Sequence, residues 1–274
     1  MSDQHCVESR GLALAWALSL RRMAASPGGV ISPFMVTVTD FADGRPDETP
    51  QIRTALDSLL PQWGEATCDT VANTIFPDPM WNRSAGAEGR DQLYRRYLRL
   101  SPRLRRICPP NRYGIYFERL IDYRGGARGV AGGTGVNQLE HVIKAFVSGR
   151  GRTPIRHSAL IAAVFDPEVD HTCQPRRGFP CMHHVTFEPH GRDGLGVTAF
   201  YATQYYYSKA YGNLLGLSRL GCFMADALSR QLVRISCVAS VAQLGCSKKR
   251  ARELLKAIGP LPSDVAQRAG DTRV

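Results

Sequence analysis

The sequence predicts a single domain of the mixed α/β (α+β) class. Its 274 residues suit one large domain, because domains commonly hold roughly 100–200 residues. Segments with helical and with alternating hydrophobic periods follow one another along the chain, and no shift in composition marks a linker. We therefore place one domain at residues 1–260 and expect a flexible C-terminal tail at residues 261–274.

The hydrophobic pattern of the first half predicts two helices and a strand. The first helix has apolar residues at helical spacing on one face: Leu12, Trp16, Leu20 and Met23. A strand is predicted at residues 29–41, where Phe34, Val36 and Val38 alternate with Thr37 and Thr39. Three further segments are predicted as a polar loop, an amphipathic helix and a glycine-rich loop, at residues 42–50, 91–100 and 124–136 respectively.

The clearest helix of the second half follows Asn137, which is a predicted N-cap with Glu140 three residues later. Its apolar face is formed by Leu139, Val142, Ile143, Phe146 and Val147. Strands are predicted at residues 157–166, 181–190, 195–207 and 231–243, the middle two forming a hairpin. Helices are predicted at residues 213–229 and 248–258, and Ser247 caps the second of these.

Composition narrows the class of protein. Hydrophobic residues make up 43% and charged residues 22% of the chain, which excludes a mostly disordered protein. The eight cysteines are too dilute for a disulfide scaffold, and we expect reduced thiols in a cytoplasmic protein. The apolar segment at residues 12–20 is too short to span a bilayer. The net charge of +11 favours an anionic partner.

Five short motifs then suggest a family. They are Tyr113-Gly114-Ile115-Tyr116-Phe117, Asn137-Gln138-Leu139, Val164-Phe165-Asp166-Pro167, Phe179-Pro180-Cys181 and Leu215-Gly216-Leu217. In their order and spacing, over roughly residues 10–245, the chain resembles the family of thymidylate synthases and (d)CMP hydroxymethylases. The resemblance implies a mixed β-sheet flanked by helices and a homodimer that packs sheet on sheet.

The resemblance also implies a chemistry. The family's cysteine adds to C6 of a pyrimidine, and C5 then takes a one-carbon unit from 5,10-methylenetetrahydrofolate. A thiolate suits this role because it is a strong nucleophile that can also leave again. Carried over, the nucleophile is Cys181, and Arg176, Arg177 or arginines of a facing subunit would lower its pKa. We expect methylation or hydroxymethylation of a pyrimidine nucleotide or a related heteroaromatic compound.

Several of the family's nucleotide-binding residues are replaced in this chain. The arginine for the phosphate falls at Ala202, the asparagine for the pyrimidine edge at Leu220, and the His-x-Tyr for the sugar at Ser240 and Ala242. Alanine cannot replace an arginine clamp, and leucine would leave a ring edge without hydrogen bonds. We therefore do not expect dUMP as the substrate, and we expect a role in specialised natural-product metabolism such as antibiotic biosynthesis.

A tyrosine-rich insertion at residues 204–211 offers material for a different pocket. A ring-shaped substrate would stack on tyrosine, with polar groups setting its orientation. The candidate substrate-binding residues are Arg156, His183, Tyr207, Asn213 and Arg219. The alternative is that these tyrosines pack in the core or in a dimer interface.

Two other functions stay open, and one kind of site is not predicted. The chain would be a catalytically inactive dimeric binding protein if it kept the fold and lost the site. It would bind or modify nucleic acid if the arginine-rich segment at residues 95–106 formed a phosphate-binding face, whereas such a face is more often simply solvated. His171, Cys173, Cys181, His183 and His184 are zinc-ligand types without the usual spacing, so we predict no metal.

Overall fold

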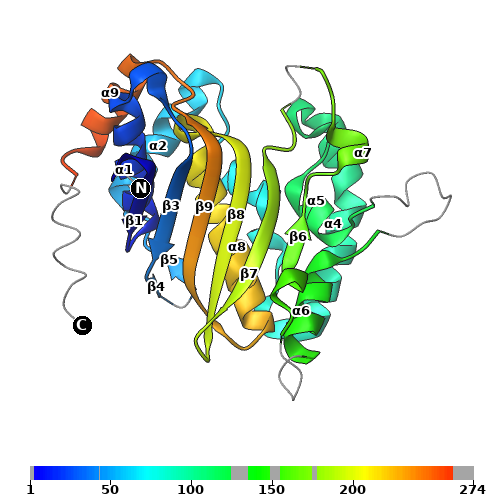
Figure 1. Cartoon of the computed structure of the whole chain (residues 1–274). Coiled ribbons are helices and arrows are strands. Elements are labelled where there is room, and N and C mark those ends of the chain that lie inside the picture. The colour runs from blue at the N-terminus through cyan, green and yellow to red at the C-terminus, as the bar shows by residue number, and fades with distance from the viewer. Residues whose placement is uncertain (1–2, 43, 125–134, 149–154, 175–177, 262–274) are drawn as a thin grey trace.

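The computed structural model describes residues 3–42, 44–124, 135–148, 155–174 and 178–261. Its centre is one mixed sheet in which the strand order is β1-β3-β9-β8-β7-β6, with β2 also paired to β9 (Figure 1). The strands are β1 (Cys6–Ser9), β2 (Val30–Ile31), β3 (Phe34–Thr39), β6 (Ile161–Ala163), β7 (Met182–His190), β8 (Gly194–Tyr205) and β9 (Gln231–Gln243). Two short strands, β4 (Phe41–Ala42) and β5 (Arg45–Pro46), pair with each other.

Helices of very different length accompany the sheet. They are α1 (Leu12–Ala25), α2 (Pro50–Leu59), α3 (Cys68–Ile75), α4 (Gly86–Ile107), α5 (Tyr116–Ile121), α6 (Gln138–Ser148), α7 (Pro167–Asp170), α8 (Tyr211–Ala227) and α9 (Lys248–Ile258). The mixed α/β class predicted from the sequence is confirmed. In the part of the chain that the structure describes, no helix is both long and apolar enough to cross a membrane.

The strand connections determine which chain segments meet at one end of the sheet. Strands β7 and β8 form an antiparallel hairpin, and α8 carries the chain from β8 back to β9, which runs parallel to β8. The start of β7 therefore lies beside the end of β8. This is the end of the sheet at which Cys181 precedes β7 and the inserted segment follows β8.

Helix α8 forms the layer between the sheet and α3. Most of its residues are buried, on several sides of the helix, as expected for a helix that packs against the sheet and α3. Gly212 and Gly216 allow α3 to approach closely, because a Cβ at Gly216 would lie 2.8 Å from the carbonyl oxygen of Ala72. The glycine of the Leu-Gly-Leu motif thus serves the packing of α8 on α3.

The other face of the sheet has no such cover. Figure 1 shows this face in front of α8, and none of the described helices lies over strands β3, β9, β8 and β7. The side chains of β8 that face the helices are fully buried, namely Val197, Ala199 and Tyr201. The side chains between them are partly exposed, namely Thr198, Phe200 and Ala202. An apolar phenylalanine therefore stands on a sheet face that the described helices leave open.

Most predicted elements are present, with changed bounds. The strand at 29–41 is split at the cis peptide before Pro33, and the helix at 91–100 is the middle of the longer α4. The predicted strand at 157–166 shrinks to the three residues of β6. The end of the strand at 195–207 is a π-helical turn at 206–210. The glycine-rich loop lies almost wholly outside the described residues, as does the tail from residue 262.

Candidate functional site

The backbone of Cys181 is held from two sides. Its amide donates a hydrogen bond to the hydroxyl of Tyr116 on α5, at 3.4 Å. Its carbonyl accepts one from the amide of Ala202 on β8, at 2.9 Å. The Cys181 Sγ lies 3.8 Å from the carbonyl oxygen of Gly178, to which the thiol can donate. The thiol is thus positioned at the start of β7 and is only partly buried.

Gly114 brings the Tyr-Gly motif against the Phe-Pro-Cys motif. A Cβ at Gly114 would lie 2.5 Å from Cε1 of Phe179, and the φ of this glycine is +149°, a value that side chains disfavour. The ring of Tyr116 packs on that of Phe179 with centroids 5.2 Å apart. Phe179 precedes a cis peptide to Pro180, directly before Cys181. Two motifs that are 65 residues apart therefore form one contact.

A buried ion pair lies beneath this contact. Arg119 on α5 forms two hydrogen bonds to the carboxylate of Asp170 on α7, at 2.5 and 2.9 Å, and a third to the carbonyl of Val164. The Asp170 side chain is fully buried and that of Arg119 is 7% exposed. The guanidinium carbon also lies 5.0 Å from the centre of the Phe179 ring. This pair links the Asp-Pro motif to the loop that carries Cys181.

Gln138 connects a fourth motif to the same region. Its side-chain amide donates to the carbonyl oxygens of Arg119 and Ala163, and its Oε1 accepts from the amide of Ala163. The Asn137 side chain caps α6 by accepting from the amide of Glu140, as predicted. The Glu140 carboxylate does not complete a capping box, because it binds Arg90 and the Tyr94 hydroxyl.

Electrostatics around Cys181 favour the neutral thiol. Burial raises the pKa of the Cys181 thiol. Burial also lowers the pKa of His183, although Asp170 acts in the opposite direction, and burial together with His183 lowers that of His184. Both imidazoles are therefore mostly neutral near pH 7 and do not supply the positive charge that would activate the thiol. Arg176 and Arg177, which were expected to do so, lie outside the described residues.

The predicted substrate-binding residues do not form one group. Arg156 is exposed and donates a hydrogen bond to the hydroxyl of Ser158. It precedes β6, whereas Asn213 and Arg219 are on α8, which follows β8. The His183 ring packs between Phe165 and Phe200, and His183 itself lies in a bulge at the start of β7. Asn213 is buried on α8.

The inserted segment packs into the protein instead of lining an open pocket. Tyr207 is 3% exposed, and its amide donates to the carbonyl of Leu244. Trp16 donates to the carbonyl of Tyr206 and packs edge-on against Tyr211. Burial raises the pKa of Tyr206 and Tyr207. Tyr206, Tyr207 and Tyr211 therefore pack in the core, which was the alternative to a pocket. Tyr205 differs, because it is 41% exposed.

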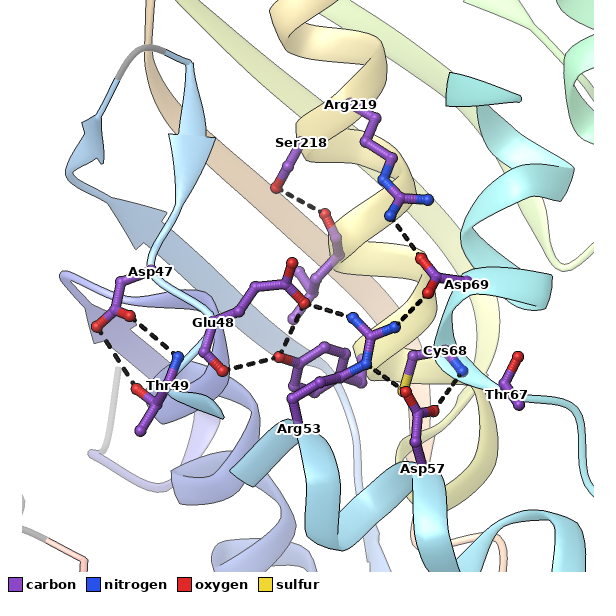
Figure 2. A network of polar contacts seen from close by, with 12 residues as sticks. Asp47, Glu48, Thr49, Arg53, Asp57, Thr67, Cys68, Asp69, Ser218 and Arg219 are labelled. Atoms are coloured by element: carbon purple, nitrogen blue, oxygen red, sulfur yellow. Dashed lines mark hydrogen bonds and ion pairs between the residues drawn. The ribbon is translucent and has the colours of Figure 1, made fainter. Parts of the chain in front are cut away.

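Arg219 belongs to a polar network that joins α2, α3 and α8. Figure 2 shows Arg53 between the carboxylates of Glu48, Asp57 and Asp69, and Asp69 also binds Arg219. The Arg219 Nη2 lies 2.5 Å from Oδ1 of Asp69, and its Nη1 donates to Asn73. The positive charge of Arg219 is therefore already matched by an acid.

A cluster of metal ligands and a surface hollow are two other features that could mark a functional site. Across the described ranges, no three His, Cys, Asp or Glu side chains are grouped so that they could hold a metal ion. A surface hollow of about 470 Å³ lies at the β2 edge, lined by residues that include His5, Arg22 and Ser32. Cys181 is not among its lining residues.

Comparison with protein-family models and with curated proteins gives no match. The candidate site therefore depends on its geometry, namely the motif residues gathered at Cys181. From the sequence, Tyr116 was named only within a motif, and neither Arg119 nor Asp170 was predicted to belong to the site. An arginine within the apolar segment Tyr116–Ile121 was the available signal, since a charge there needs a buried partner.

Proposed function

We propose that this protein is a thymidylate synthase-like one-carbon transferase. It would methylate or hydroxymethylate a pyrimidine nucleotide or a related heteroaromatic compound through a covalent bond from Cys181. The observation that supports this proposal is that four of the motifs belong to one network of contacts. Gly114 and Tyr116 contact the Phe-Pro-Cys motif directly, and Arg119 links Phe179 to Gln138 and Val164. Motifs that were only coincidental in sequence would have no reason to meet in one region of the fold.

The proposed role of Cys181 is nucleophilic. The Sγ gives up its proton and bonds to a ring carbon that is conjugated to a carbonyl group. The electron pair of the ring double bond moves to the neighbouring carbon, which becomes the nucleophile for the one-carbon unit. After that carbon loses its proton, elimination returns the sulfur–carbon electron pair to Cys181. Because burial raises the pKa of this thiol, the substrate complex must supply the charge that ionises it.

The cofactor in this proposal is 5,10-methylenetetrahydrofolate, which would supply a one-carbon unit at the oxidation level of formaldehyde and, for methylation, the hydride that reduces it; hydroxymethylation would take water instead. Its acidic tail requires cationic partners. Lys209 and Arg219 do not fit this need, since Lys209 pairs with Glu65 and Arg219 with Asp69. The assay below therefore includes the folate as a variable.

The remaining substrate contacts are proposed from the sequence. Arg156 would bind an anionic group of the substrate, and His183 would lie near the ring. Tyr207 and Asn213 would shape the pocket only from beneath, because both are buried. For Arg219 to bind substrate, its ion pair with Asp69 would have to open.

Labelled methylenetetrahydrofolate and a panel of pyrimidine nucleotides and nucleosides test the proposal. We expect label to enter one of the pyrimidines and Cys181→Ala to lower the rate by at least about 1000-fold, the scale typical of removing a nucleophile. The matched control is Cys246→Ala, which removes another partly buried thiol. Full activity of Cys181→Ala would show that the mechanism is wrong. Neither product nor adduct across the whole panel would overturn the pyrimidine proposal.

The partner that we propose is a second copy of this chain, packed on the open sheet face. Phe200 stands on that face, stacked on the ring of His184 with centroids 5.7 Å apart. We expect Phe200→Asp to convert a dimer into a monomer, because a buried carboxylate without a partner disfavours the interface. Sedimentation equilibrium measures the change, and Val147→Asp, at an exposed apolar residue of α6, serves as the control. A wild-type protein that is monomeric at tens of micromolar would contradict the proposed dimer.

One observation favours a second candidate function, a dimeric binding protein without catalysis. The Cys181 thiol has its pKa raised by burial, and no described cation counteracts this effect. In that case a ring compound would raise the melting temperature of the wild type and of Cys181→Ala equally, and no label would be transferred.

A further inference from the structure

Four arginines form a stripe along the exposed side of α4, and we call Arg96, Arg99, Arg103 and Arg106 the arginine stripe. Their spacing of three, four and three residues places them on one helix face. With a rise of about 1.5 Å per residue, the stripe is about 15 Å long. The opposite face of α4 packs into the core through Leu93, Tyr94, Tyr97 and Ser101.

The arginines of the stripe have no acidic partner within the described ranges. The neighbouring Arg95 binds Glu88 and Asp91, and Arg105 binds Glu118 across the helix surface. All four stripe residues are exposed and none takes part in an ion pair among the described residues. Helix α4 carries seven arginines against two acidic residues, so it concentrates a large share of the chain's net charge of +11. Unpaired like charges on one face repel each other, which a counter-anion would relieve.

The chemistry of the stripe fits phosphate groups in a regular row. A guanidinium offers paired N–H donors that match the oxygens of a phosphate, and the stripe contains arginine only. One strand of a duplex presents a phosphate about every 3.4 Å along its axis. A length of about 15 Å therefore faces about four phosphates, one for each arginine.

The surroundings of the stripe favour a duplex backbone over a lipid surface. A helix that lies in a membrane inserts its apolar face, whereas that face of α4 is buried in the core. The aromatic side chains of α4, Tyr94 and Tyr97, are buried, so the bases of a single strand could not stack on them. We propose that the arginine stripe binds the sugar–phosphate backbone of a nucleic-acid duplex without reading its sequence.

A fluorescence titration with a labelled 20-base-pair DNA duplex tests the inference, with an RNA duplex of the same sequence beside it. Neutralising four phosphates predicts that log K falls with log salt with a slope of about −3.6. The association constant should therefore fall about 150-fold between 50 and 200 mM salt. Similar results with the two duplexes would support recognition of the sugar–phosphate backbone.

The variant with all four stripe arginines changed to glutamine should lose most of this slope. Its matched control changes four exposed cations on other elements to glutamine: Arg45, Lys144, Arg192 and Arg252. The two variants have the same net charge, so only the position of the charge differs. A circular dichroism spectrum confirms that each is folded.

Three results would overturn the inference. One is no duplex binding by the wild type at 50 mM salt. Another is an equal loss in both variants, which would show that only the net charge matters. The third is binding to vesicles of phosphatidylcholine with 30% phosphatidylserine but to neither duplex. A loss confined to the stripe variant supports it, whatever the outcome of the one-carbon transfer assay.

Discussion

Replacing Arg119 by methionine should lower the free energy of unfolding by about 3–5 kcal/mol, the range for breaking a buried ion pair. The substitution leaves the Asp170 carboxylate buried without its bidentate partner, and the Val164 carbonyl loses a donor. Denaturant unfolding measures the loss. Methionine fills a space similar to that of arginine, so the loss of stability would report the missing charge and not a cavity.

The control for this prediction is Arg105→Met. Arg105 reaches Glu118 only at 3.6 Å, and its side chain is 42% exposed. Surface ion pairs contribute about 0–1 kcal/mol, so this change should be nearly silent. Replacing Asp170 by leucine as well should recover only part of the stability, since Asp170 also accepts from the amide of Asp166. Equal effects of the two arginine substitutions would contradict a structural role of the buried pair.

Gly114→Ala should cost about 2–6 kcal/mol and displace the loop before Cys181. Two causes add up: a φ of +149° costs a side-chain-bearing residue about 1–3 kcal/mol, and the overlap with the Phe179 ring costs about as much again. Denaturant unfolding measures the stability. The rate of Cys181 alkylation reports the displacement.

Gly64 provides the control for the glycine substitution. Its φ is +73°, yet no heavy atom lies within 4 Å of the position of its Cβ. Gly64→Ala should therefore cost only the backbone term, about 1–2 kcal/mol. Phe179→Leu should relieve part of the cost of Gly114→Ala if the ring is the obstacle. Additive effects of those two substitutions would refute the contact.

Much of the sheet was predictable because its strands alternate in hydrophobicity. Strands β7, β8 and β9 follow this pattern closely, and α8 follows a continuous apolar period. Helices α2, α3 and α5 were missed, since α5 spans only six residues and α2 buries only two. The predicted strand at 157–166 was too long because a 3-10 turn at His157–Ala159 precedes β6 and Pro167 begins α7 soon after it.

The sequence proposes Cys181 as the nucleophile but does not predict the residues that hold its backbone. Cys181 was chosen from a local motif, whereas the hydrogen bond that its amide donates to the Tyr116 hydroxyl joins residues 65 positions apart. Arg219 was chosen for its charge, but the sequence does not reveal that Asp69 lies beside it. Spatial neighbours across elements decide whether a cation is free, and periodicity carries no information on them.

The side chains at the two sheet edges affect how the protein behaves at high concentration. At the β6 edge, the Gln138 amide occupies both backbone groups of Ala163, in the way a further strand would. At the β1 edge, the Arg22 guanidinium donates to the carbonyl of Cys6. Unblocked edges recruit strands from other molecules and start fibrils. These two side chains thus protect the folded protein from strand-by-strand polymerisation, while the sheet face remains available for association.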